Sequence, residues 1–122
     1  MYALTAIDWT EIEDLLRHGV KTYELVCADH ITIAKNSKKK DKIFITNLSK
    51  QDVNTGLEGI IAEIQDIKTG YWRTVPREYD EKELLTVRIK VKYLNDVRVV
   101  KLNDKGDGEG LTVEVKEQML LG

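Results

Sequence analysis

The chain lacks several features that define whole classes of protein. In its 122 residues it has one cysteine, Cys27, and one proline, Pro76. A lone cysteine excludes an internal disulfide and a zinc site built from cysteines. No apolar run approaches the ~20 residues that a membrane-spanning helix needs, and the first residues lack the basic segment and long apolar stretch of a signal peptide. We therefore expect a cytoplasmic protein with no membrane segment.

A large excess of charge of either sign is also missing. The 19 basic and 21 acidic residues give a formal net charge of -2. This balance argues against a protein that coats nucleic acid by bulk attraction, because such binding depends on many phosphate contacts. A local basic patch remains possible in the run Lys35, Lys38, Lys39, Lys40 and Lys42. The alternative is a solvated lysine-rich loop.

What the chain does have is enough length and apolar content for one folded domain. Its 122 residues and 14.0 kDa fit a single domain over residues 1–122. A domain of this length buries roughly two-thirds of the surface of its unfolded chain, so it needs no disulfide or metal to hold a core.

Helical spacing is clear near the start. After an expected strand over residues 2–7, Asp8 looks like a helix N-cap, with Glu11 completing a capping box. Gly19 stands where a left-handed C-cap belongs. Between them the apolar residues recur with the helical period: Trp9, Ile12, Leu15 and Leu16. Residues 29–36 are expected to form a second short helix.

Short strands account for most of the remaining chain. We expect them over residues 22–27, 42–48, 59–67, 71–75, 85–93, 97–102 and 111–115, with a loop over 49–58 and a turn at 69–70. The pattern is clearest over 85–93, where apolar residues alternate with Thr, Arg and Lys. Six or more strands with two small helices predict an α+β, mostly β fold, with an antiparallel sheet closed or nearly closed as a small barrel.

The sequence offers few candidate catalytic residues. His18 and His30 have no partner at metal-ligand spacing and no credible nucleophile beside them. We therefore predict no catalytic residue, no metal and no cofactor.

The stretch GYWRTVPREYD, residues 70–80, mixes aromatic and basic side chains: Tyr71, Trp72 and Tyr79 with Arg73 and Arg77. Aromatic faces stack bases and guanidinium groups hold phosphates, so this mixture is typical of single-stranded nucleic-acid recognition. It also arises when aromatics at a strand end pack on a core while arginines stay in water.

The stretch GVKTYELV, residues 19–26, resembles the Gly-x-Lys-x-x-Glu-x-Arg signature of ASCH domains, a branch of the PUA-like superfamily. Gly19, Lys21 and Glu24 match, whereas Val26 stands where the family has Arg. The stretches KKDKIFITN and EGIIAEI are similar to the strand pair that follows in those domains, so the resemblance covers about residues 8–67. The whole chain also resembles a small uncharacterised family of archaeal proteins, a domain of unknown function.

The resemblance implies a PUA-like β-barrel that binds RNA or a modified nucleotide in a cleft at the junction between the first helix and the next strand. In that reading Lys21 neutralises a phosphate, Glu24 accepts hydrogen bonds from a base edge or orients Lys21, and Tyr71 or Trp72 stacks on a base beside Arg73. The five ligand-binding candidates are thus Lys21, Glu24, Tyr71, Trp72 and Arg73.

Two other readings stay open. One ASCH branch hydrolyses acylated cytidine with a Lys, a Thr and a Glu, which would make this chain an amidohydrolase with Lys21 as the polarising group and Glu24 or Glu63 as base. Glu24 occupies the position of that branch's Thr, which disfavours the hydrolase. The other reading is a non-catalytic protein-interaction domain with an exposed strand edge, in which Gly19 is only a helix cap and Lys21 a solvated residue.

Overall fold

The computed structural model describes residues 1–74, 82–103 and 110–118, with the backbone alone over 71–74 and 82–85. Its elements are, in chain order, β1 (Ala3–Leu4), α1 (Trp9–His18), β2 (Val20–Leu25), α2 (Ala28–Lys35), β3 (Lys42–Ile45), a 3-10 turn (Lys50–Asp52), β4 (Glu58–Thr74), β5 (Lys82–Asn103) and β6 (Thr112–Glu117). The predicted α+β, mostly β class is confirmed. No described helix is long and apolar enough to cross a membrane.

The strands form one sheet in the order β1-β3-β4-β5-β2, with β6 also paired to β5. The predicted antiparallel barrel, closed or nearly closed, is therefore corrected in two respects. The β1–β3 pair is parallel, and the ladder does not close. A single antiparallel bridge, between Tyr2 and Thr112, brings the start of the chain against β6 and curls the sheet around.

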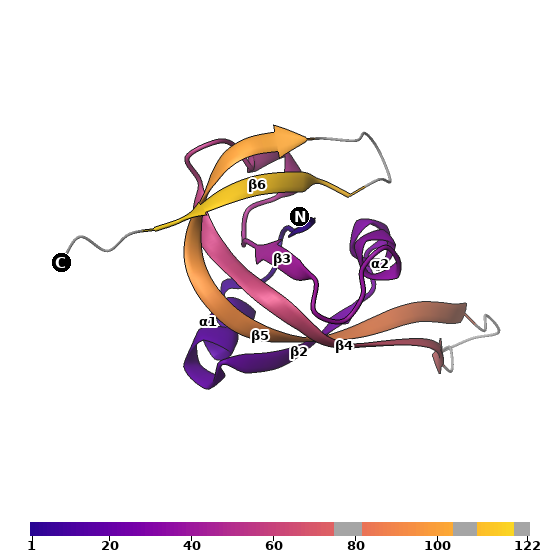
Figure 1. The fold of residues 1–122 in the computed structure, drawn as a ribbon. Coiled ribbons are helices and arrows are strands. Elements are labelled where there is room, and N and C mark those ends of the chain that lie inside the picture. Colours follow the sequence, from indigo (N-terminus) through magenta and orange to yellow (C-terminus); the bar gives the residue numbers. More distant parts are fainter. Residues whose placement is uncertain (75–81, 104–109, 119–122) are drawn as a thin grey trace.

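Strands β4 and β5 are much longer than expected. The predicted turn at Thr69–Gly70 is wrong, because these residues pair with Val87 and Thr86 inside a continuous ladder. The predicted break before Val97 is also absent from β5. Irregularities in register at Ile61/Ala62, Ile64/Asp66 and Val99/Lys101 let the strands bend without ending. Figure 1 shows the result, two long curved ribbons running from the β4–β5 hairpin to β6.

Two hydrophobic cores lie on opposite faces of the same strands. Alternate residues of β3 divide between them, with Ile43 and Ile45 in one core and Phe44 in the other. Ile60 and Ile61 of β4 divide in the same way. A strand buried on both faces needs apolar residues at consecutive positions, which explains the unbroken runs IFI and GIIA.

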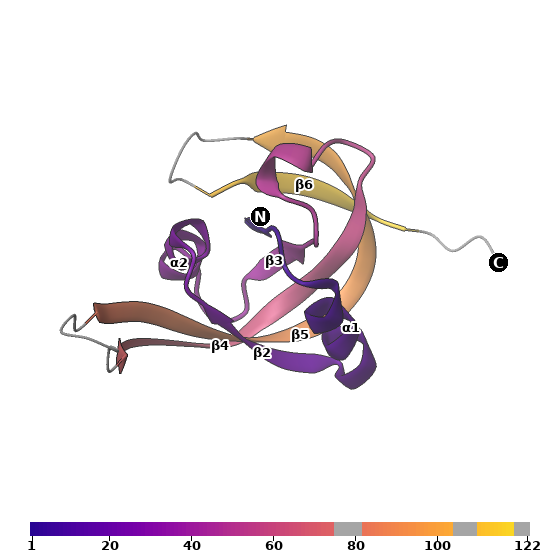
Figure 2. The ribbon, with the colours of Figure 1, turned by 180° about the vertical axis from the view of Figure 1, so that it is seen from behind.

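The helices cover the first of these cores. Ile12 and Leu15 of α1 and Ile33 of α2 pack there with Val87, Ile89 and Val91 of β5. Figure 2 shows α1 in front of β5, and α2 beside the outer part of β4 and β5. The second core is enclosed by the curled sheet itself, and its members include Ala3, Phe44, Val97, Val99 and Val113.

Helix α1 begins and ends where the sequence predicts. Gly19 adopts the left-handed conformation, with φ of 77°, and its N–H donates to the Leu15 carbonyl at 2.7 Å. The predicted capping box does not form, because the Asp8 side chain makes no cap hydrogen bond. Instead the Asp8 carbonyl accepts from the N–H groups of Glu11 and Ile12 at 2.9 and 3.1 Å.

The remaining differences concern element ends. The first strand stops at Leu4 because Ala6 turns the chain with a φ of 54°. Helix α2 starts at Ala28 with Cys27 as its N-cap, one residue before the expected start at Asp29.

Candidate functional site

Lys21 is already paired within the fold. Its Nζ lies 2.8 Å from Oε2 of Glu11 and 3.1 Å from Oδ2 of Asp14, and 20% of its side chain is accessible. These hydrogen bonds, the one to Glu11 first, raise the pKa of Lys21, and the same ammonium lowers the pKa of Asp14 by hydrogen bonding and charge. Lys21 therefore ties β2 to α1, and a ligand phosphate would compete with two carboxylates for it.

Tyr23, two residues further along β2, completes this attachment. Its hydroxyl donates to the Glu11 carbonyl at 3.0 Å, and the Lys21 Nζ lies 5.9 Å from the centre of its ring. Burial raises the pKa of Tyr23, and the charges of Glu11 and Asp14 raise it further. The residues that follow Gly19 thus hold α1 against the sheet.

Glu24 lies on the other face of β2. Tyr23 and Leu25 are buried, whereas Thr22 and Glu24 are exposed, so the strand alternates and Lys21 and Glu24 point to opposite sides. Glu24 sits directly across from Arg88 of β5. The structure does not bring Lys21 and Glu24 together, which disfavours a hydrolase that uses them as a pair.

Glu63, the alternative base, lies on the face that carries Glu24. Its Oε1 accepts a hydrogen bond from Gln65 at 2.7 Å, and its register partners are Lys42 and Lys92. Glu24 does line a groove of about 550 Å³, together with Tyr23, Glu11 and His30, between β2 and residues 6–8. Lys21 is not part of that groove's lining.

Tyr71, Trp72 and Arg73 lie in the outer part of β4, opposite Leu85, Leu84 and Glu83. Their side chains fall outside the described part of the structure, as do Arg77 and Tyr79 altogether. Lys21 pairs with Val91, six residues along β5 from Leu85. At about 3.4 Å per residue, roughly 20 Å of strand separates Lys21 from Tyr71, so the predicted residues do not form one cleft.

Cations gather instead on the outer face of β4 and β5 and on the adjoining start of β3 with the loop before it. We call this surface the cationic face and define it by six residues: Lys39, Lys42, Lys68, Arg88, Lys90 and Lys92. Arg88, Lys90 and Lys92 alternate with Val87, Ile89 and Val91, which are fully buried on the helix side. Register places three carboxylates in the same rows: Glu24 across from Arg88, Asp66 across from Lys90 and Glu63 across from Lys92.

The ion pairs on this face leave part of its charge uncompensated. Lys39 and Lys68 approach Asp66 at 3.6 and 4.0 Å, with 70% and 77% of their side chains accessible. Such long, exposed pairs are weak and open easily. Within the described residues no hydrogen bond or ion pair engages the side chain of Lys90 or Lys92. The ammonium groups of Lys90 and Lys92 are therefore available to an anion.

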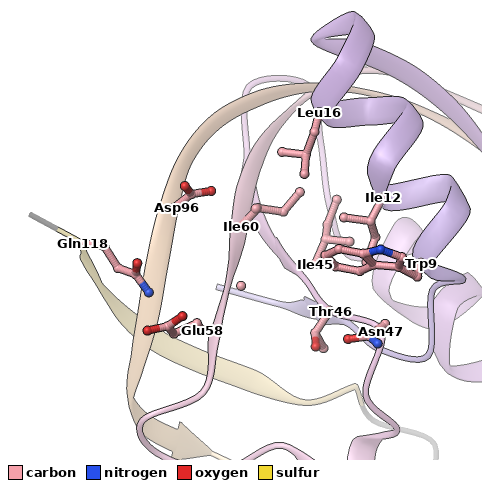
Figure 3. Close-up of a pocket in the computed structure, with 11 residues that line it drawn as sticks. Trp9, Ile12, Leu16, Ile45, Thr46, Asn47, Glu58, Ile60, Asp96 and Gln118 are labelled. Atoms are coloured by element: carbon pink, nitrogen blue, oxygen red, sulfur yellow. The ribbon is translucent and has the colours of Figure 1, made fainter. Parts of the chain in front are cut away.

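A second feature is a cleft of about 310 Å³ on the helix side of the sheet, which we call the Trp9 cleft. Figure 3 shows α1 forming one wall with Trp9, Ile12 and Leu16. The opposite wall carries polar side chains from the start of β4, from β5 and from the residue after β6, namely Glu58, Asp96 and Gln118. Among the described residues, no three His, Cys, Asp or Glu side chains group as metal ligands.

Sequence reasoning found part of the cationic face and missed the Trp9 cleft. The lysine run that the sequence offers as a basic patch supplies two residues of this face, Lys39 and Lys42. The alternation over 85–93 predicted one wet face, but the register that aligns Lys42 and Lys68 with it comes from strand pairing. Trp9 was assigned to the helix's apolar stripe, although it is 54% exposed. Trp9 does stand three residues before Ile12, on the apolar stripe, so only its place as the first residue of α1 signalled its exposure.

A comparison with known protein families assigns the chain to one of them. A model of the family described as "Protein of unknown function (DUF473)" matches residues 1–113, so the chain belongs to this family. It is also similar to a protein of Methanocaldococcus jannaschii named "Uncharacterized protein MJ0105", with 27% identity over 122 residues that cover 98% of this chain and 73% of the relative. No solved structure matches. The predicted kinship with an uncharacterised archaeal family is confirmed.

Proposed function

We propose that this protein is a nucleic-acid-binding module of the PUA-like type that holds single-stranded RNA by its phosphates along the cationic face. The observation that carries the proposal is the gathering of six cations against three carboxylates on one described face of a chain whose net charge is -2. Phosphate contacts supply most of the affinity of sequence-tolerant RNA binding. The curled, mostly β sheet with two helices supports the PUA-like part of the proposal.

The rows of the cationic face lead along the β4–β5 hairpin towards the predicted stacking residues. From the Lys68–Arg88 row, Gly70–Thr86 and then Trp72–Leu84 follow at two-residue steps. At about 3.4 Å per residue, Trp72 stands roughly 14 Å along β4 from Lys68. That spacing suits a strand of RNA whose phosphates lie on the lysines while a base stacks on Trp72. Tyr71 and Arg73 occupy the alternate positions of β4, so Trp72 is the stacking candidate for this path. Glu24 would then face a base or orient Arg88.

Fluorescence anisotropy of a labelled single-stranded RNA of mixed sequence, measured over a series of salt concentrations, tests this function. With three phosphates held by Arg88, Lys90 and Lys92, we expect a log–log salt slope of about -2. Replacing Lys90→Glu and Lys92→Glu together should weaken binding by at least about tenfold at low salt and bring the slope towards about -0.7.

A matched control separates this surface from net charge. Lys101 and Lys116 are exposed and lie where β5 pairs with β6. Lys101→Glu with Lys116→Glu changes the total charge by the same amount, yet should leave the affinity within about twofold, because screening makes distant exposed charges weak. Equal losses in the two double variants, or no binding at low salt, would rule the proposal out.

A further inference from the structure

The Trp9 cleft is a separate site. It lies on the helix side of the sheet, where Ile12, Ile45 and Ile60 form its base, whereas the cationic face is on the opposite side of β5. From its walls we propose that the cleft binds small organic cations, molecules in which an ammonium or guanidinium group is carried on a short apolar or aromatic body. This inference does not depend on RNA binding.

The helix wall supplies a surface for the apolar body. Trp9 is 54% exposed and Leu16 41% exposed, although large apolar side chains on an amphipathic helix are usually turned inward. Both border the cleft beside Ile12. Within the described residues no hydrogen bond holds the Trp9 indole. An indole face also attracts a cation that lies within about 6 Å of the ring.

The opposite wall supplies negative charge. In Glu58 and Asp96 one carboxylate oxygen accepts a side-chain hydrogen bond and the second oxygen remains open: Arg98 Nη2 donates to Oε1 of Glu58 at 3.2 Å, and the Tyr93 hydroxyl donates to Oδ1 of Asp96 at 2.8 Å. An ionised carboxylate only accepts hydrogen bonds and offers about four lone-pair sites. The wall can therefore take further N–H donors, and it repels phosphates and carboxylates.

The size of the cleft limits the ligand. Its volume of about 310 Å³ is near the lower end of the roughly 300–1,000 Å³ typical of small-molecule sites. A single ring with a short amine chain fits this volume. The combination of an aromatic wall, an apolar base and two carboxylates opposite selects a charged donor at one end and an apolar group at the other.

Three probes with the same ring and different charge test this directly: 2-phenylethylamine, 2-phenylethanol and 3-phenylpropionate. Binding is followed by the shift of the Trp9 indole N–H signal in nitrogen-15 NMR spectra, which a Trp72→Phe variant assigns because the chain has only two tryptophans. We expect the amine to bind at least about tenfold more tightly than the alcohol, because one charge-assisted hydrogen bond contributes that much affinity. The carboxylate should bind most weakly.

Matched variants locate the effect. Asp96→Asn with Glu58→Gln keeps the shape of the wall and removes its charge, so the preference for the amine over the alcohol should disappear. Glu114→Gln, an exposed carboxylate of β6 outside the cleft, should leave that preference unchanged. Trp9→Leu should weaken the binding of the uncharged alcohol as well. In this variant the backbone signals of Thr46 and Asn47 report binding.

Three outcomes would overturn the inference. They are no saturable shift with the amine, an amine no tighter than the alcohol, and a preference that survives neutralisation of Glu58 and Asp96. None of these outcomes bears on RNA binding, since the cleft variants leave every residue of the cationic face in place, and the lysine variants leave the cleft intact.

Discussion

The two ends of helix α1 differ in how the chain uses them. At its C-terminal end Gly19 turns the backbone, Lys21 pairs with Glu11 and Asp14, and the Tyr93 N–H donates to the Gly19 carbonyl at 2.8 Å. Every polar group named there has a partner. At its N-terminal end Trp9 stands half exposed over a cleft whose far wall is acidic.

The recognisable motif therefore lies at the closed end of the helix, and the open surface lies at the end without a motif. The Gly-x-Lys-x-x-Glu spacing reflects only local structure, namely the turn from helix α1 into strand β2. A cleft needs walls from several elements, and the three carboxylate and amide groups facing Trp9 lie 49, 87 and 109 positions away from it in the chain (Glu58, Asp96 and Gln118). Four substitutions test this contrast.

The largest effect is expected at the cleft. A Cβ on Gly59 would lie 2.5 Å from both Cε2 and Cζ of Phe44, which is fully buried in the second core, and 3.1 Å from the Ile45 carbonyl oxygen. Gly59→Ala should lower the free energy of unfolding by about 2–3 kcal/mol, since overpacking a filled core costs this much. Urea titration followed by circular dichroism measures it.

Phe44→Leu removes the two clashing atoms, so the Gly59→Ala and Phe44→Leu double variant should be less destabilised than the sum of the singles. Strict additivity would mean that the Gly59 contact is not the cause.

A smaller loss is expected at the closed end. A Cβ on Gly19 meets no atom within 4 Å, so Gly19→Ala suffers only from its φ of 77°. The cost should be about 1 kcal/mol, the strain of an L-residue in the left-handed region. Gly19→Asn is the control, because Asn tolerates this conformation. A loss for Gly19→Ala as large as that of Gly59→Ala would contradict the contrast.

Lys21→Met should cost less again. It removes two ion pairs whose carboxylates are 42% and 44% accessible, so we expect a loss of stability of about 0.5–1 kcal/mol. The RNA affinity, measured by anisotropy, should stay within about twofold of that of the unsubstituted protein, because Lys21 points to the opposite face of the sheet from Lys90 and Lys92 and is paired with two carboxylates. A marked loss of RNA affinity would show instead that Lys21 contributes to RNA binding.

The pH dependence of stability provides a second readout for Lys21. The pKa of Asp14 is lowered by folding, so its contribution is complete above the unfolded value of about 3.9 and is lost as the pH falls below it. The pKa of Lys21 is raised, so its contribution is complete below about 10.4 and is lost as the pH rises through the higher folded value.

Between these pH limits the ion pairs contribute a constant amount to the free energy of unfolding. The stability of Lys21→Met should therefore differ most from that of the unsubstituted protein in this range. Tyr23, whose pKa folding also raises, adds to the loss of stability on the alkaline side in both proteins. Urea midpoints measured from acid to alkaline pH test this; a difference that does not shrink at either limit would contradict the pairing.

The smallest effect on stability is expected for Glu58→Gln. The Glu58–Arg98 ion pair is exposed on both sides, with 65% and 57% of the side chains accessible, so the unfolding free energy should change by less than about 0.5 kcal/mol. Amine binding in the Trp9 cleft should nevertheless weaken severalfold, since a charged acceptor is lost. A stability loss above 1 kcal/mol would show that Glu58 has a structural role.

What the sequence alone determined is the local structure. The period of Ile12 and Leu15 with Gly19 behind them placed α1, and the alternation over 85–93 placed a strand with one wet face, because helix caps and side-chain periodicity act over a few residues. The break at Thr69–Gly70 was wrong for a reason that only pairing supplies: a neighbouring strand keeps a weak strand former extended.

Only the tertiary structure decided which residues share a surface. The register of β2, β4 and β5 set Glu24 beside Arg88 and away from Lys21, and aligned Lys68, Lys90 and Lys92 on one face. The curl of the sheet brought Glu58 and Asp96 opposite Trp9. Spacing along a chain cannot encode such neighbours, because a shift of one residue in register moves every side chain of a strand to the other face.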